Sequence, residues 1–307
     1  MSNAIRAHLA LIGVNIFYGA NHIVAKGVMP DYLGPNAFIF FRVSITSILF
    51  FIFFKLFINE KIDKKDYYKF ALCGLFGVTI NQLFFFNGLE ITSAFNAGII
   101  MTSTPILVVL LAFFILKEQI TLVKIIGIVS GAIGAILLTS AGRIPGFDNP
   151  TGDLFIFINA LSFGLYLVLV KPLMSKYKPL TVITYNFLFG LFFVCCYPNV
   201  SQELIETNFN QFNTVIWSRI TFVIIGATFF TYLLNIYALK YVSPSVSGSY
   251  IYTQPILVII FTILFGYLGW AEDYSGSISF EKISYMLLIF LGVYLISKGS
   301  VKAITRN

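Results

Sequence analysis

The chain has 307 residues, of which 58% are hydrophobic, 17% aromatic and 11% charged. Charged residues make up about a quarter of an average soluble domain, so 20 basic and 13 acidic side chains are too few to cover a soluble protein of this length. The composition therefore excludes a soluble domain and predicts a protein whose solvent is lipid. The formal net charge of +7 could suit nucleic acid, but no basic face with interleaved stacking residues accompanies it. We expect no nucleic acid to bind.

Ten stretches of the chain are nearly free of Asp, Glu, Lys and Arg and approach the roughly 20 residues that a helix needs to cross a bilayer. Continuous apolar runs such as 99–116 do not alternate as the strands of a membrane barrel do. The sequence therefore predicts an all-α integral membrane protein with ten transmembrane helices. The predicted spans are residues 6–26, 36–58, 69–89, 95–116, 122–140, 153–173, 180–198, 217–239, 246–267 and 281–299.

The basic residues are unevenly divided between the two sides of these spans. Cytoplasmic loops retain Lys and Arg, so the side with more of them is predicted to be cytoplasmic. The other side has Lys26, Arg143, Arg219 and Lys282, and Arg42 lies inside the second span. Both termini of this multi-pass chain are therefore predicted to be cytoplasmic, and topology accounts for the positive charge. The basic residues of the cytoplasmic side are Arg6, Lys55, Lys61, Lys64, Lys65, Lys69, Lys117, Lys124, Lys171, Lys176, Lys178, Lys240, Lys298, Lys302 and Arg306.

The second half of the chain repeats features of the first half, as in many transporter folds. Gly19 and Lys26 of the first span have counterparts in Gly164 and Lys171 of the sixth. Because each half has five spans, an odd number, the halves must be inverted relative to each other. We expect a first five-helix repeat at 1–141, a linker at 142–152 rich in turn residues, and a second five-helix repeat at 153–307. Further counterparts are Leu89, Ser93, Gly98 and 105–108, which recur as Leu239, Ser243, Gly248 and 255–258.

These features resemble the EamA-type transporters of the drug/metabolite transporter superfamily. The resemblance rests on the five-plus-five layout, on an aromatic residue and Gly followed by Lys in the first helix of each half, and on Pro105 and Pro255 in each fourth helix. The fourth loop and fifth helix are also similar to the family's, with Glu118 followed by Gly127, Gly131 and Gly134.

The chain departs from the family pattern at Tyr18 and Phe163, where members often have Trp, and residues 269–280 look like an insertion relative to the first half. The resemblance implies export or exchange of small metabolites, commonly amino acids or related amphipathic compounds. It also implies a location in the cytoplasmic (inner) membrane.

Polar side chains at membrane depth are costly and are expected to face a cavity or another helix. In the first span Asn15, Tyr18 and His22 lie on one helical face. His22 is the deep side chain that most readily exchanges a proton near neutral pH, so it is a candidate for solute binding or proton transfer. For every candidate, hydrogen bonding between helices is the alternative explanation. The predicted solute-binding residues are Asn15, Tyr18, His22, Asn81, Gln82, Tyr166, Tyr232, Asn235 and Tyr252.

Charged residues near the predicted outer boundary and prolines within helices predict a gate and two hinges. Lys26, Arg42 and Glu90 fall within about two turns of the predicted outer boundary, which predicts an outer gate closed by Glu90 with Lys26 or Arg42. Snorkelling of Arg42 to the lipid head groups is the alternative. Pro105 and Pro255 each leave a backbone carbonyl unpaired in a helix, which predicts a hinge in each half.

A stripe of small residues on the fifth span, Gly127, Gly131 and Gly134, allows close approach of another helix. That helix belongs either to the same bundle or to a second protomer. A homodimer is therefore one alternative for the partners of this chain, beside the solute and the lipid bilayer.

Several classes of function find no support in the sequence. It has no metal, nucleophile–base or paired-carboxylate motif of an enzyme and no charged ring or selectivity loop of a channel, and we expect no cofactor. No acid lies deep in a span, so proton coupling requires His22 or a boundary acid, and facilitated diffusion or exchange is the alternative. We expect export or exchange of a small metabolite by alternating access. The rival is a transporter or flippase of a lipid-linked or sugar-containing solute on the same fold.

Overall fold

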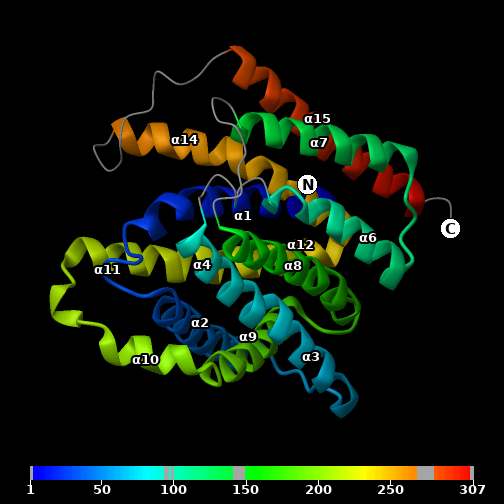
Figure 1. Ribbon diagram of the computed structural model, residues 1–307. Helices are drawn as coiled ribbons and strands as arrows, with labels where there is room; N and C mark the ends of the chain where they lie inside the picture. The colour runs from blue at the N-terminus through cyan, green and yellow to red at the C-terminus, as the bar shows by residue number, and fades with distance from the viewer. Residues whose placement is uncertain (1–2, 93–96, 98–99, 141–148, 268–279, 305–307) are drawn as a thin grey trace.

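The structure is a computed structural model that describes residues 3–92, 97, 100–140, 149–267 and 280–304. In these ranges the regular elements are all helices (Figure 1). The first half contains α1 (Asn3–Lys26), α2 (Pro35–Phe57), η1 (Lys64–Asp66), α3 (Tyr67–Gly74), η2 (Leu75–Ile80), α4 (Asn81–Ile91), α6 (Thr104–Leu116) and α7 (Leu122–Ser140). The second half contains α8 (Pro150–Lys176), α9 (Pro179–Cys195), α10 (Pro198–Glu206), η3 (Phe209–Gln211), α11 (Thr214–Thr221), η4 (Phe222–Phe230), α12 (Thr231–Tyr241), α13 (Pro244–Ser249), η5 (Tyr250–Thr253), α14 (Gln254–Tyr267) and α15 (Phe280–Ile304).

Six of the continuous helical stretches are long and apolar enough to cross a membrane: 3–25, 35–57, 64–91, 150–176, 214–241 and 244–267. A seventh is obtained if α9 and α10, which are bent by 76° relative to each other, form one span. The predicted all-α membrane protein is therefore confirmed. The predicted number of ten spans is not, because α6 and the apolar parts of α7 and α15 have only 10–17 residues each.

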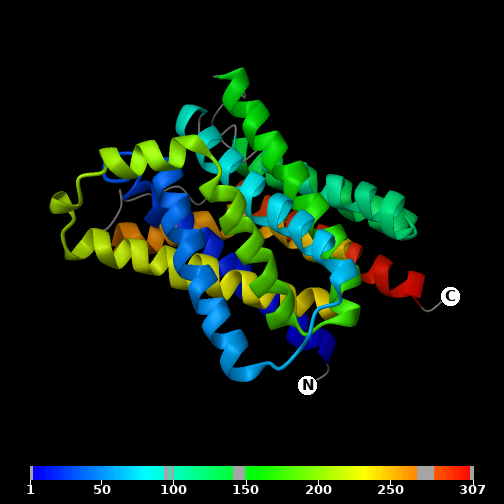
Figure 2. The same ribbon diagram turned by 90° about the horizontal axis from the view of Figure 1, so that it is seen from below.

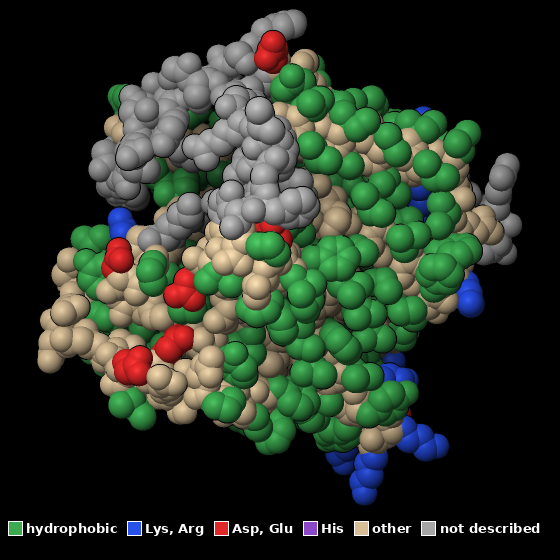
Figure 3. Space-filling view, viewed as in Figure 1, with side chains coloured by type: hydrophobic (Ala, Val, Ile, Leu, Met, Phe, Trp, Pro, Cys, Tyr) green, Lys and Arg blue, Asp and Glu red, His purple; other side chains and the backbone are tan. Residues whose placement is uncertain are grey.

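Side chains on the outside of the bundle match this assignment. Large apolar residues are exposed along most helices, including Phe114 of α6 at 65% and Leu287 of α15 at 64%. In Figure 3 hydrophobic side chains cover most of the visible face, with the acidic side chains toward one end and most basic ones toward the other. An exposed apolar surface of this extent needs lipid around it.

The two halves interlock in a paired pattern. α1 packs against α12 and α14 of the second half, and α8 packs against α4 and α6 of the first half. α2 likewise pairs with α9, and α7 with α15 (Figures 1 and 2). The contacts of α1 with α12 and α14 therefore correspond to those of α8 with α4 and α6, as expected for two repeats.

Two glycines at counterpart positions show the same equivalence of contacts between the halves. A Cβ atom at Gly19 would lie 2.7 Å from Leu257 Cβ and 3.3 Å from Phe261 Cδ2, and one at Gly164 would lie 3.1 Å from Leu111 Cδ1. Leu111 precedes Phe261 by 150 positions, the same separation as that of Pro105 and Pro255 in the two fourth helices. Small residues at these two counterpart positions therefore let the first helix of each half approach the fourth helix of the other.

The glycine stripe of α7 is used inside this chain. A Cβ atom at Gly127 would lie 2.9 Å from the Gly292 carbonyl oxygen, and one at Gly134 would lie 2.9 Å from the Tyr285 carbonyl oxygen, both in α15. The two helices therefore pack backbone to backbone, and this stripe is not free for a second protomer.

The predicted repeat boundaries at 141 and 153 remain predictions. Most of the predicted linker, and the whole loop 269–279, lie outside the described residues. The described end of the linker begins α8, where Asn149 Oδ1 accepts hydrogen bonds from the amides of Thr151 at 3.0 Å and Gly152 at 3.1 Å. Asn149 is thus the N-cap of the first helix of the second half.

Candidate solute-binding cavity

A cavity of about 100 Å³ lies where the two halves meet. Its walls come from α1, α2, α4, α8, α12, α13, η5 and α14, so both halves contribute. Six of the predicted solute-binding residues line this cavity: Asn15, Tyr18, Asn81, Gln82, Tyr232 and Asn235. Apolar side chains such as Phe85, Phe163 and Ile251 separate the polar groups. Mostly apolar walls with a few polar groups are typical of small-molecule sites.

Three of the predicted solute-binding residues are not among those that line the cavity. Tyr166 packs its ring against Gly77, where a Cβ atom would meet the ring at 2.3 Å. The ring of Tyr252 covers Gly131, and its hydroxyl donates to the Ile128 carbonyl oxygen at 3.4 Å. Both tyrosines therefore join helices. His22 belongs to α1, but its side chain lies outside the described part of the structure.

The α1 wall is joined to the second half through Asn15. The Asn15 Nδ2 donates to the Leu11 carbonyl oxygen at 2.8 Å, and its Oδ1 accepts from Gln254 Nε2 of α14 at 3.3 Å. Tyr18 and Asn21 continue the same wall one and two turns further along α1. The spacing of Asn15 and Tyr18 in the sequence correctly indicated this polar face.

Two π-helical segments precede the polar groups of α4 and α12. η2 ends at Ile80, directly before Asn81 and Gln82, and η4 ends at Phe230, directly before α12 with Tyr232. π-helical turns inside a helix occur often at functional sites. Here each shifts the residues that follow it around the helix axis, and the shifted residues line the cavity.

Hydrogen bonds across the halves fix these polar groups. Tyr232 donates its hydroxyl proton to the Gly77 carbonyl oxygen at 3.0 Å and accepts from Gln82 Nε2 at 3.5 Å. Asn159 Nδ2 of α8 donates to the Asn81 carbonyl oxygen at 2.7 Å. The amide and phenol groups therefore have defined orientations, which is the condition for selective recognition.

Arg42 of α2 reaches the cavity instead of the outer boundary. The residue is 4% exposed, and its Nε donates to Thr228 Oγ1 at 3.1 Å. Its guanidinium carbon lies 4.7 Å from the centroid of the Phe86 ring and 5.7 Å from that of Phe38. The structure therefore shows neither snorkelling nor, among the described side chains, the predicted ion pair with Glu90. The two rings and Thr228 hold the guanidinium inside.

The gate formed by Lys26 with Glu90 and the hinges at Pro105 and Pro255 remain predictions. The side chain of Lys26 is outside the described residues, so pairing with Glu90 remains a prediction. Pro105 lies in the first turn of α6 and Pro255 in that of α14. At this position proline interrupts no helical hydrogen bond. The break in each fourth helix lies before the proline, and a hinge there also remains a prediction.

Five polar residues that line the cavity are not among those predicted to bind the solute: Asn21, Arg42, Asn159, Ser247 and Gln254. Asn21 follows Tyr18 by three residues, so its helical spacing could have indicated it. Gln254 directly precedes Pro255, and a polar group beside a helix break is a further signal. Nothing in the local sequence separates a cavity-lining Arg42 from one that snorkels, because only the neighbouring helices decide between them.

The comparisons with known proteins cover the same two halves. The model of the EamA-like transporter family matches residues 5–140 and again residues 150–298. The chain belongs to this family. The predicted resemblance is therefore confirmed, and the cavity is that of an EamA-like transporter.

Relatives of this EamA-like chain come from several kingdoms. An uncharacterized transporter of Archaeoglobus fulgidus is 25% identical, over 86% of this chain and 89% of its own length. The uncharacterized transporter YyaM of Bacillus subtilis is 25% identical, over 84% of this chain and 86% of its own. A WAT1-related protein of Arabidopsis thaliana is 24% identical, over 97% of this chain and 87% of its own length. A solved crystal structure aligns with a TM-score of 0.74 over 96% of this chain and 98% of that one, at 16% identity, and shows the same fold.

Proposed function

We propose that this protein exports or exchanges a small metabolite, an amino acid or a similar amphipathic solute, across the cytoplasmic membrane. The observation that carries the proposal is the cavity with amide and phenol groups from both halves. A site between two repeats can be exposed to either side when the repeats exchange conformations, which is the basis of alternating access. The membrane-crossing helices of EamA-like transporters and the apolar surface of this chain are consistent with it.

The finer parts of the proposal concern topology and motion. Ten membrane-crossing helices in two inverted repeats, with both termini cytoplasmic, are the arrangement in which alternating access works most simply. In this arrangement the breaks before Pro105 and Pro255 act as the hinges, and Glu90 with Lys26 closes the outer side. Because no acid is found among the described residues that line the cavity, facilitated diffusion or exchange is the proposed mode, and His22 is the residue through which protons would couple.

The experiment is uptake of radiolabelled amino acids and nucleosides by proteoliposomes, with and without a pH gradient. We compare the native protein with Asn15→Leu and with the control Ile16→Ala, a neighbour in α1 that is 41% exposed toward lipid. Saturable uptake that falls at least tenfold in Asn15→Leu and persists in Ile16→Ala supports the proposal. Gradient dependence that disappears in His22→Ala adds proton coupling.

Two results would contradict this function. Uptake of no water-soluble solute favours the rival, a transporter or flippase of lipid-linked or sugar-containing solutes, which is checked with labelled lipid-linked sugars in the same vesicles. Equal uptake by the native protein and Asn15→Leu removes the cavity from the pathway. Either result is read against the control variant, which reports correct insertion.

A further inference from the structure

The charge of the cavity is unbalanced. Among its described lining residues Arg42 is the one charged side chain, and none is acidic. The ionisable groups that interact electrostatically with Arg42 are the phenols of Tyr232 and Tyr18, which carry no charge at neutral pH. A buried cation without a counter-charge is costly. A residue kept in this state is a candidate for binding a ligand that supplies the missing charge.

The guanidinium is held in one orientation with part of it free of protein partners. Thr228 Oγ1 donates its own proton to the Val223 carbonyl oxygen at 2.8 Å, so it can only accept from Arg42 Nε. The Phe86 ring packs against the guanidinium carbon. The Arg42 Nη1 is buried and has no hydrogen-bonding partner among the described residues. A guanidinium fixed at Nε presents its remaining N–H groups as a fork for a carboxylate.

Two amide oxygens of the same cavity lack donors. Tyr232 gives its proton to Gly77, so the Gln82 atom facing the phenol must be the donor Nε2, and Oε1 is the other end of that amide. Asn159 is fixed similarly, because its Nδ2 donates to the Asn81 carbonyl oxygen. Gln82 Oε1 and Asn159 Oδ1 are both buried, and neither has a hydrogen-bond partner in the described part of the chain. Buried acceptors of this kind are usually satisfied, so each needs a donor from elsewhere.

We propose that Arg42 binds the carboxylate of the solute, and that the amide oxygens of Gln82 and Asn159 accept hydrogen bonds from a donor on the same solute, an ammonium or a hydroxyl group. This rests on the proposed function and restricts its solutes to small carboxylates that also carry a hydrogen-bond donor. Amino acids and hydroxy acids satisfy both conditions. Simple amines and cationic drugs do not, because the cavity already contains a positive charge.

The test measures binding separately from transport. The full-length protein in detergent is screened for a rise in Tm with the common L-amino acids and with their 2-hydroxy analogues. Two further series are the corresponding carboxylates that have neither an amino nor a hydroxyl group, and the amino acid carboxamides. We expect stabilisation by amino acids or hydroxy acids, weaker stabilisation by the plain carboxylates and none by the carboxamides. The relative response to the amino and hydroxy series identifies which donor is preferred.

Variants then assign each end of the ligand. Arg42→Gln should weaken binding of every carboxylate about tenfold or more, since one charge-assisted hydrogen-bond pair is lost, and Arg42→Lys should keep part of it. Gln82→Leu and Asn159→Leu should weaken binding of amino or hydroxy acids and leave the plain carboxylates unaffected. Lys55→Gln is the matched control, because Lys55 is an exposed cation of the same helix, α2. If Arg42→Gln does not fold, Thr228→Val keeps the guanidinium but removes the acceptor for Nε.

Binding of carboxamides as tight as that of carboxylates, or no response to any carboxylate, overturns the assignment of Arg42. The same holds if Arg42→Gln and Lys55→Gln respond equally. Counterflow of the best ligand in proteoliposomes tests the proposed function separately. Transport that does not depend on a carboxylate leaves the function standing and removes this inference. Binding through Arg42 without transport of any solute supports this inference and contradicts the proposed function.

Discussion

The hydroxyl of Tyr232 in α12 donates a hydrogen bond to the backbone carbonyl of Gly77 in η2, 3.0 Å away. This bond joins the third helix of one half to the third helix of the other, and it ends on a π-helical segment. In such a segment the hydrogen-bonding ladder is displaced, and carbonyl groups become available to partners outside the helix. The phenol therefore ties the cavity wall to the irregular backbone that shapes it.

Tyr232→Phe should destabilise the protein and reduce transport. The substitution leaves the Gly77 carbonyl without its donor and Gln82 Nε2 without its acceptor, which costs about 1–3 kcal/mol for a buried group. Differential scanning fluorimetry in detergent measures the fall in Tm. Tyr241→Phe is the control, because Tyr241 lies at the exposed end of the same helix. Equal Tm values for the two variants would show that the bond to Gly77 contributes nothing.

The side chain of Glu203 in α10 should stabilise the N-terminus of α2, whose N-cap residue Gly34 has no side chain to do so. Its Oε2 accepts from the backbone amides of Asn36 at 2.7 Å and Ala37 at 3.0 Å, so a carboxylate meets the positive end of the helix dipole. Glu203→Ala should cost about 1 kcal/mol, and Glu203→Gln less, because the amide oxygen can still accept. Hydrogen exchange of the Asn36 and Ala37 amides measures the loss directly. Glu206→Ala, on the exposed side of α10, serves as the control, and faster exchange in that variant as well would refute this role of Glu203.

Much of the fold could be predicted from the sequence because a lipid solvent imposes long apolar helices. The expected spans 36–58 and 122–140 agree with α2 and α7 to within a residue at each end. The breaks were not predicted, because a π-helical turn or the short 3₁₀ segment η5 has the same hydrophobic composition as a regular helix. The predicted span 180–198 ends at the bend between α9 and α10, but the helix α10, which begins at Pro198, was not predicted.

The site was predictable where polar residues follow helical spacing, and not where packing between helices decides. Asn15 and Tyr18 share one face, and both line the cavity. Tyr252 was predicted because it lies about one turn before Pro255, yet its ring packs on Gly131 of α7, a residue 121 positions away in the chain. Arg42 shows the converse, because the Phe rings that hold it inside come from α2 and α4 together. Such contacts become visible only in three dimensions.

Gly292→Ala should separate α7 from α15 and lower stability without changing the oligomeric state. A Cβ atom at Gly292 would lie 2.6 Å from both Cα and N of Gly131, and backbone cannot move aside as a side chain can. Overpacking of this kind costs about 1–3 kcal/mol. Leu287→Ala on the lipid-facing side of α15 is the control. Light scattering of the detergent complex should give the same protein mass for both variants, and a change of mass in Gly292→Ala would place the stripe between protomers instead.

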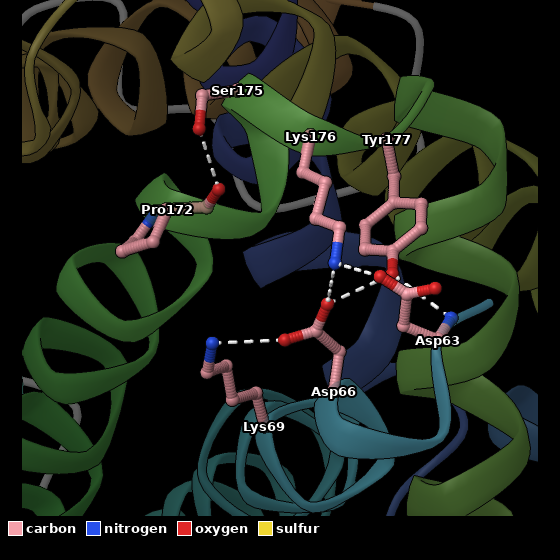
Figure 4. Close-up of polar contacts among 7 residues, drawn as sticks. All are labelled: Asp63, Asp66, Lys69, Pro172, Ser175, Lys176 and Tyr177. Carbon is pink, nitrogen blue, oxygen red and sulfur yellow. Dashed lines mark hydrogen bonds and ion pairs between the residues drawn. The ribbon is translucent and has the colours of Figure 1, made fainter.

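The ion pair between Asp66 and Lys176 should hold the first half against the second at one end of the bundle. Asp66 Oδ2 accepts from Lys176 Nζ at 2.6 Å and from the Tyr177 hydroxyl at 2.8 Å, while Oδ1 accepts from Lys69 at 2.9 Å (Figure 4). Lys176 also pairs with Asp63 in the segment before η1. These residues join the chain around η1 to the end of α8, so any motion that parts the two elements must break several charge-assisted bonds.

Asp66→Asn should therefore lower Tm and raise the rate of exchange in proteoliposomes, if the motion that exposes the cavity on this side separates η1 from α8. Lys176→Met should have the same effect, and the double variant should add little to either, because the two substitutions remove the same pair. Lys178→Met is the control, a neighbouring exposed lysine without an ion pair among the described side chains. High salt should reduce the difference between native protein and Asp66→Asn, since Lys176 is half exposed and its pairing is screened. Additive effects of the two single substitutions would show that Asp66 and Lys176 act independently, and the contact would then not be a single latch between the halves.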